Sequence, residues 1–212
     1  MNDIILNFST FLGKWQTLIG ATFGGVIGLL AALIVAHDAR RRDECSAAML
    51  LTVDLSSVLA TEHALDEKIK SDNIQDKDKA QFTANLLMCS MPALSPMHEI
   101  SQIKVMIVDV YLSAHLSLFQ TFYKDITRMV NELSEAAEIK RKTGTDTLSP
   151  GEIKTKVNLI ERGFRKACDH SRCSQVYINK FILGRFPTFS KLLRVVKFIV
   201  YDKECRKLLK NG

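Results

Sequence analysis

The chain has 212 residues, of which 47% are hydrophobic and 25% are charged, and only four are proline. This composition excludes a disordered chain, which has fewer apolar residues, and a fibrous chain, which has more Pro and Gly. The net charge of +6 would suit a nucleic-acid-binding protein if it were spread over the whole chain. Residues 178–212 hold nine Lys and Arg and only two acidic residues, so the rest of the chain has a net charge of −1.

The N-terminal region contains one long uncharged segment. After an amphipathic lead-in over residues 1–14, residues 15–36 carry no charged side chain. A helix of this length spans about 33 Å, close to the hydrocarbon core of a bilayer at about 30 Å. A buried helix of a soluble protein is the alternative, but such helices usually have about 10–14 apolar residues. We therefore predict a transmembrane helix over 15–36, with the lipid bilayer as its partner.

Basic residues near the predicted span indicate its orientation. Lys14 precedes the span, and Arg40, Arg41 and Arg42 follow it. Because basic residues concentrate on the cytoplasmic side, we expect the N-terminus outside and residues 37–212 in the cytoplasm. The five cysteines are odd in number and irregular in spacing, as expected for reduced thiols.

Small residues recur every four positions along the predicted span. They are Gly20, Gly24, Gly28, Ala32 and Ala36, and a second set (Ala21, Gly25, Gly28, Ala32) defines another small face. Small side chains at this spacing let two helices approach closely in a membrane. We predict self-association or packing on a partner membrane helix, although membrane helices are also rich in Gly and Ala for no specific reason.

Residues 37–184 are predicted to form a cytoplasmic bundle of about four helices, making an all-α protein. A helix should continue from the span to about Lys70, because no proline precedes Pro92. Its apolar seam follows heptad spacing and is interrupted by Glu62. The seam residues are Ala48, Leu51, Leu55, Val58, Leu65 and Ile69. A polar turn over 71–79, a short helix over 80–90 and a connector over 91–96 should follow.

Two longer helices complete the predicted bundle. The first should run over 96–142 and end before Gly144. Its predicted buried face comprises Ile103, Ile107, Val110, Ala114, Phe119, Phe122, Ile126, Val130, Leu133 and Ala137. Residues 104–112 are rich in β-branched residues and could form a strand, but no partner strand is visible. Ser149 and Glu152 form a capping box that should start the second helix, which runs to about Gly184.

Residues 185–212 are predicted to form a basic amphipathic helix. Its basic positions are Lys191, Arg194, Lys197, Lys203, Arg206 and Lys207. On a membrane-anchored protein such a helix could contact anionic lipid headgroups, or it could be a bundle helix with a solvated basic edge. Nucleic acid is not an expected partner, because no helix-turn-helix, zinc-finger or RNA-binding signature is present.

No catalytic, metal or cofactor site is predicted. Cys168, His170 and Cys173 have zinc-ligand residue types, but on a continuous helix their side chains point in different directions. The chain has no recognised nucleotide, nucleophile or metalloprotease motif. An enzyme with an unrecognised site is the alternative.

The layout resembles that of uncharacterised bacterial single-pass inner-membrane proteins over about residues 15–125. The matching positions are Trp15, Leu18, Ile19, Gly20 and Ala21, then Arg40–Arg42, Pro92 and Pro96, then Phe122 and Tyr123. The resemblance implies a bacterial inner-membrane location and brings no established activity.

These features together predict a non-enzymatic, membrane-anchored scaffold or interaction protein. We expect the small-residue face and the seam to mediate a homo-oligomer or contact with a partner membrane protein. The alternative is a membrane-active effector, whose small-residue face assembles into a pore or perturbs the bilayer.

Overall fold

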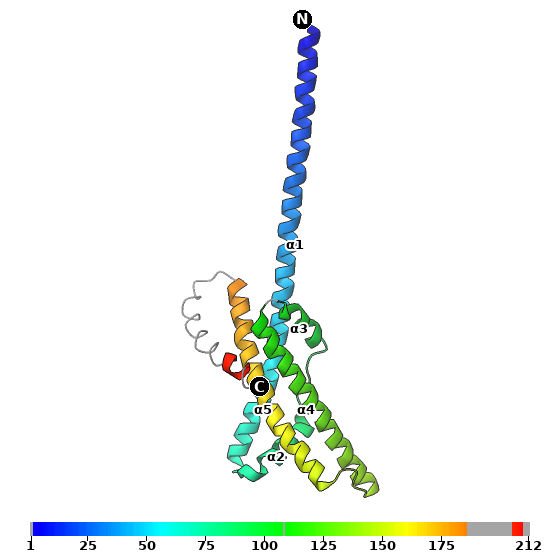
Figure 1. Ribbon diagram of the computed structural model, residues 1–212, viewed down its shortest axis with the longest axis vertical. Coiled ribbons are helices and arrows are strands. Elements are labelled where there is room, and N and C mark those ends of the chain that lie inside the picture. The colour runs from blue at the N-terminus through cyan, green and yellow to red at the C-terminus, as the bar shows by residue number, and fades with distance from the viewer. Residues whose placement is uncertain (1, 108, 186–204, 210–212) are drawn as a thin grey trace. The chain divides into compact units, whose positions relative to one another are not determined.

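The computed structural model describes residues 2–107, 109–185 and 205–209, and its regular structure is helical throughout these ranges (Figure 1). The helices are α1 (Asn2–Ser71), α2 (Asp76–Ser90), α3 (His98–Met106), α4 (Val110–Thr143) and α5 (Pro150–Arg185). A further helical turn covers residues 205–209. The predicted all-α class is confirmed. The chain divides into two compact units, Met1–Cys45 and Ser46–Gly212.

Helix α1 continues without interruption from the apolar segment to Ser71, as predicted. It ends where Asn73 adopts a left-handed conformation with φ of 53°. The amide of Ile74 then donates to the carbonyl of Ile69 at 3.0 Å. This is a Schellman arrangement, and Asn is one of the few non-glycine residues that tolerate it.

The seam of α1 is buried within the second unit. Its six residues are at most 8% exposed, and five of them are fully buried. Helix α5 packs beside this part of α1, since the Ser171 hydroxyl donates to the Leu55 carbonyl at 3.1 Å. The other side of α1 exposes Met49, Leu50 and Val53. The heptad seam is therefore buried by contacts within the same chain.

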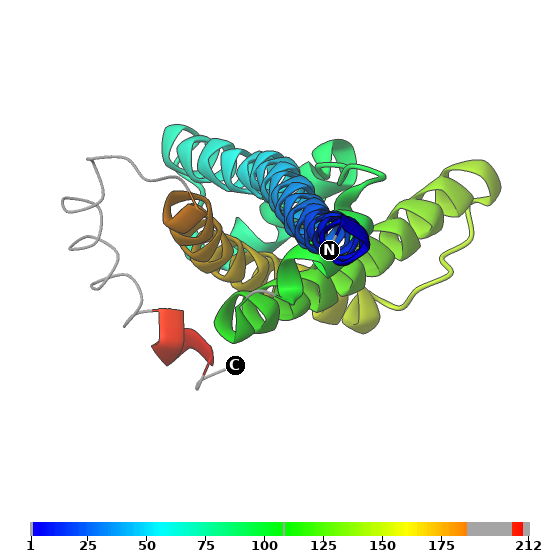
Figure 2. The ribbon, with the colours of Figure 1, turned by 90° about the horizontal axis from the view of Figure 1, so that it is seen from above.

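Helices α4 and α5 pack against each other and form much of the core (Figure 2). Their buried apolar residues recur at steps of three and four, as expected for one face of each helix. On α4 these are Leu112, Leu116, Phe119, Tyr123, Ile126, Val130 and Leu133, and on α5 Val157, Ile160, Phe164, Ala167, Ile178 and Phe181, with the buried Ser171 and Ser174 continuing the spacing between Ala167 and Ile178. The helices approach closely at Gly163, where an added Cβ would lie 3.1 Å from Ile126 Cγ1.

Helix α2 begins four residues earlier than predicted, at Asp76. Asp76 and Asp78 lie in its first turn, where acidic side chains interact favourably with the helix dipole. The helix buries Thr83, Ala84 and Leu87 and packs on α5 and α4.

The prediction of one helix over 96–142 is wrong. The chain leaves helical geometry at Asp109, which has φ of −146° and ψ of 126°. Its Oδ1 accepts hydrogen bonds from the amides of Tyr111 at 2.8 Å and Leu112 at 3.1 Å. Because Asp109 caps the next helix, α3 and α4 are separate. No strand occurs in the part of 104–112 that the structure describes.

The break also changes which apolar residues are buried. Ile103, Ile107 and Val110 were predicted to lie in the core but are 64%, 74% and 82% exposed. Ala137 is exposed, and Ala114 and Phe122 are half-buried. The predicted burial of Phe119, Ile126, Val130 and Leu133 is confirmed.

The predicted end of α4 and the predicted start of α5 are confirmed. Gly144 has φ of 71°, and its amide donates to the Lys140 carbonyl, which ends α4. In the capping box, the Ser149 amide donates to Glu152 Oε2 at 2.8 Å and the Glu152 amide donates to Ser149 Oγ at 3.3 Å. Of the predicted basic positions, Arg206 and Lys207 are exposed on the helical turn 205–209. Lys191, Arg194, Lys197 and Lys203 lie outside the described residues.

Candidate functional site

The apolar segment of α1 has an open surface. Within the described chain, Leu18–Ser71 is the one helix long and apolar enough to cross a membrane. Eleven large apolar side chains between Trp15 and Val35 are each at least half exposed. A Cβ added at Gly20, Gly24 or Gly28 would meet no atom within 4 Å. The small-residue face is therefore uncovered in a single copy of the chain.

The arginines after this segment form local ion pairs. Arg40 Nε lies 2.9 Å from Glu44 Oε1, and Arg42 Nη2 lies 3.4 Å from Asp38 Oδ2. Both pairs are one helical turn apart, a spacing at which ion pairs support a helix.

Glu62, the exception in the seam, is the centre of a buried ionic cluster. Its side chain is only 7% exposed and pairs with Arg165 and Arg172 of α5. Arg165 Nη2 also donates to Asp66 Oδ1 at 2.7 Å. A buried carboxylate needs such partners, because leaving it unpaired costs several kcal/mol. The cluster thus ties α1 to α5 and is part of the packing.

Cys168 lies against this cluster and is unreactive as a thiol. Burial and the carboxylate of Glu62 raise its pKa well above the usual range. Since the thiolate is the nucleophile, a raised pKa removes its reactivity at neutral pH.

A second polar cluster lies between α4 and α5. The imidazoles of His115 and His170 are both buried and meet through their Nδ1 atoms at 3.0 Å. Tyr177 stacks on His115, and Phe122 stacks on His170. Burial, followed by the neighbouring His170, lowers the pKa of His115 to about 4, and burial also lowers that of His170. Both rings are therefore neutral at pH 7.

The three residues with zinc-ligand chemistry face three different neighbours. Cys168 contacts Glu62, His170 contacts His115, and Cys173 hydrogen-bonds to Cys205. Among the residues that the structure describes, no three His, Cys, Asp or Glu side chains are grouped to hold a metal ion. The Cys205 thiol and burial raise the pKa of Cys173.

A third buried pair connects α1 with the start of α3. Asp54 Oδ2 lies 2.8 Å from His98 Nδ1, and Asp54 Oδ1 accepts from the Ser95 amide at 3.1 Å. Nearby, the Tyr123 hydroxyl donates to the Pro92 carbonyl. His98 is 3% exposed, so a substrate has no access to this acid–base pair. Its chemical role is to hold the 91–97 connector on α1.

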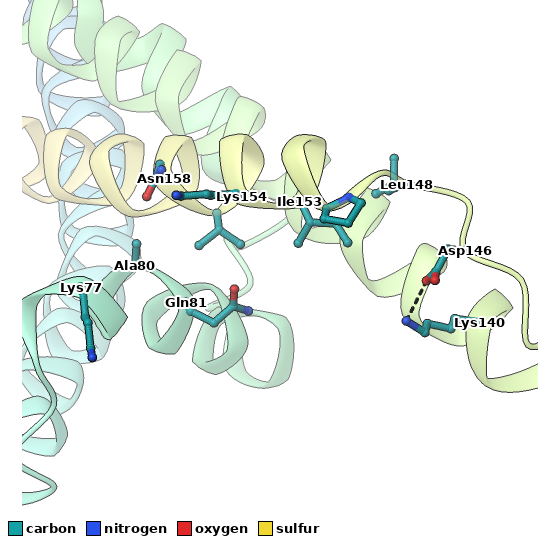
Figure 3. Close-up of a pocket in the computed structure, with 11 residues that line it drawn as sticks. Lys77, Ala80, Gln81, Lys140, Asp146, Leu148, Ile153, Lys154 and Asn158 are labelled. Atoms are coloured by element: carbon teal, nitrogen blue, oxygen red, sulfur yellow. Dashed lines mark ion pairs between the residues drawn. The ribbon is translucent and has the colours of Figure 1, made fainter.

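A ligand-sized depression lies between α2 and the start of α5 (Figure 3). It has a volume of about 410 Å³. Ala80, Leu148 and Ile153 provide apolar surface, and Lys77 and Lys154 lie at its edge. Lys140 Nζ pairs with Asp146 Oδ1 at 2.8 Å. The lining includes no His, Cys, Ser or Tyr, and its ionisable side chains are those of Lys77, Lys140, Lys154 and Asp146. The depression could hold a small ligand.

No protein-family model, curated protein or solved structure matches this chain.

Sequence reasoning missed the partners of the buried polar residues. Arg165 and Arg172 are seven residues apart and share one face of α5, a spacing that could have indicated a common partner. The matching signal on α1 was Glu62, a charged residue within an otherwise apolar seam. The histidine pair had no comparable signal, because His115 and His170 are 55 residues apart in the sequence.

Proposed function

We propose that the protein is a single-pass, membrane-anchored helical scaffold that self-associates through its span and has no enzymatic activity. The observation that carries this proposal is the exposure of all the large apolar side chains between Leu18 and Val35. Leaving ten such half-exposed side chains in water costs on the order of 10 kcal/mol in total. Transfer of this segment into a bilayer removes that cost.

The small-residue face supports self-association. Gly20, Gly24 and Gly28 leave a shallow surface along α1 with no atom of the same chain over it. In lipid, two helices associate mainly through close packing, which small residues permit. A second copy is the simplest partner, because it carries the same surface.

The bundle is the part that would bind partners in the cytoplasm. The seam of α1 is buried, so docking would use exposed surfaces such as the depression beside α2. Arg40, Arg41 and Arg42 support a cytoplasmic bundle, and the bacterial inner membrane is the location we infer from the layout.

Self-association can be tested with full-length protein in membranes. We expect Gly24→Ile and Gly28→Ile to reduce dimerisation, measured by crosslinking or a membrane dimerisation reporter. Thr22→Ile is the matched control, because it adds a similar side chain to the same span away from the stripe. Equal dimerisation in all three variants would contradict the proposal.

The orientation can be tested by labelling Cys89, the one exposed cysteine of the five. An impermeant maleimide should label it only after cells are permeabilised. In a Cys89→Ser background, a cysteine introduced by Asn2→Cys should be labelled in intact cells. The reverse pattern would show the opposite topology.

Expression of the protein also separates the scaffold from a membrane-active effector. A scaffold leaves the membrane potential unchanged. Depolarisation that is lost with Gly24→Leu would instead support a pore.

A further inference from the structure

The second unit has an apolar surface that its own core does not use. We call it the α3 apolar face, and it consists of Ile100 and Ile103 of α3, Ile107 just after the end of α3, and Val110 at the start of α4. These four side chains are between 50% and 82% exposed, whereas His98, Gln102 and Val105 on the other side of α3 are buried. Single exposed apolar residues are common, but four within eleven positions mark an interaction surface.

This face lies at the end of the second unit that α1 enters. The Ser171 hydroxyl of α5 donates to the Leu55 carbonyl of α1. Because the two helices are antiparallel, six residues forward on α5 and six residues back on α1 bring Tyr177 level with Met49. Tyr111 stacks on Tyr177, which places the start of α4 at the same level. Figure 1 shows α3 and the start of α4 together at this end of the unit.

Basic and aromatic side chains accompany the α3 apolar face. The Arg206 guanidinium lies 4.3 Å from the centre of the Tyr111 ring, and Arg206 Nη1 donates to the Tyr111 hydroxyl at 3.2 Å. Tyr111 directly follows Val110, and both Arg206 and Lys207 are exposed. Exposed isoleucines, a tyrosine and two cations at one end of a bundle are the chemistry of a membrane-interface contact.

We propose that the α3 apolar face inserts into the headgroup region of the bilayer that α1 crosses, with Arg206 and Lys207 against anionic headgroups. This inference rests on the proposed membrane span.

A bilayer fits this surface better than a second copy of the chain. Two copies meeting through the α3 apolar face would bring the cations of Arg206 and Lys207 toward each other. An anionic leaflet instead complements those charges while it takes up the isoleucines.

Tryptophan fluorescence with brominated lipids tests the proposal on the full-length chain. Trp15 is the one tryptophan, so Trp15→Phe provides a dark background. Three single-tryptophan variants are then reconstituted in phosphatidylcholine–phosphatidylglycerol vesicles whose phosphatidylcholine carries bromine. Phe23→Trp reports on the span, Ile103→Trp on the α3 apolar face, and Leu159→Trp on an exposed position of α5. Equal far-UV circular dichroism shows that each variant is folded.

We expect Phe23→Trp to lose most of its emission with bromine deep in the acyl chains. Ile103→Trp should shift to the blue and lose most of its emission with bromine near the headgroups, while Leu159→Trp is unchanged. If Ile103→Trp behaves like Leu159→Trp while Phe23→Trp is quenched, the inference is wrong and the span stands. If Phe23→Trp is not quenched, the proposed membrane span itself fails.

Two further experiments test the role of the two cations and the alternative that a second copy of the chain covers the face. Arg206→Gln with Lys207→Gln, or vesicles without phosphatidylglycerol, should reduce the quenching of Ile103→Trp. Unchanged quenching would overturn the role of the two cations. An emission shift of Ile103→Trp that depends on protein density and not on brominated lipid would assign the face to a second copy and overturn the proposal.

Discussion

The Nδ1 atoms of His115 and His170 lie 3.0 Å apart inside the interface of α4 and α5. One ring must donate and the other accept, so at least one of these nitrogens has to be unprotonated. Protonation of both rings would place two positive charges in contact between Tyr177 and Phe122. This packed interface is therefore incompatible with protonation of both histidines.

The histidine pair should make the bundle sensitive to acid. The pKa of His115 is about 4 in the folded chain, below its ordinary value of 6.5, so the unfolded state binds more protons between these values. The stabilisation is present above pH 6.5 and is lost as the pH falls toward 4, by roughly 2 kcal/mol. Thermal unfolding in detergent across this range measures it.

His115→Gln should flatten this pH dependence relative to the wild type, because glutamine keeps a polar group and does not titrate. His63→Gln, at an exposed position of α1, is the matched control and should leave the slope unchanged. Parallel pH profiles of His115→Gln and wild type would contradict the assignment.

Removing the carboxylate of Glu62 should destabilise the bundle strongly. Glu62→Ala leaves Arg165 and Arg172 without their shared partner, at an expected cost of roughly 2 kcal/mol, because both arginines are partly solvated. Glu67→Ala, at an exposed position five residues farther along α1, should change stability by less than about 0.5 kcal/mol. Chemical denaturation of both variants gives the comparison, and equal stabilities would show that the cluster is not needed.

Asp109 should stabilise the start of α4 and so keep α3 and α4 as separate helices. Asp109→Ala removes the acceptor for two amides of α4 and should cost about 1 kcal/mol, whereas Asp109→Asn should retain most of the cap. The unfolding temperature of each variant is the measurement. A variant with alanine that is as stable as the one with asparagine would rule out capping as the cause of the break.

Two glycines of α5 provide a paired test of the close contact between α4 and α5 at Gly163. Gly151 has no atom within 4 Å of an added Cβ, so Gly151→Ala should stabilise the helix by up to about 1 kcal/mol. Gly163→Ala must displace Ile126 and should lose that gain or destabilise the protein. Equal gains from both substitutions would mean that α4 and α5 are farther apart at this position.

Local patterns in the sequence were sufficient for much of the fold. The continuous α1, its end near Lys70, the capping box of Ser149 and Glu152 and the αL residue Gly144 each depend on residues a few positions apart. The seam of α1 and the buried faces of α4 and α5 also follow from spacing, because a helix repeats every 3.6 residues. The same local information predicted an apolar helix long enough to cross a bilayer.

Tertiary structure decided what these elements do to one another. Glu62 breaks the seam because two arginines about 100 positions away reach it, and His115 is neutral because packing buries its ring against His170. The apolar face of α3 looked like core in the sequence, but the cap at Asp109 separates the helix from α4 and leaves Ile103 and Ile107 exposed. Periodicity specifies which residues share a face, whereas only the folded chain determines which faces meet and which remain for the membrane or a partner.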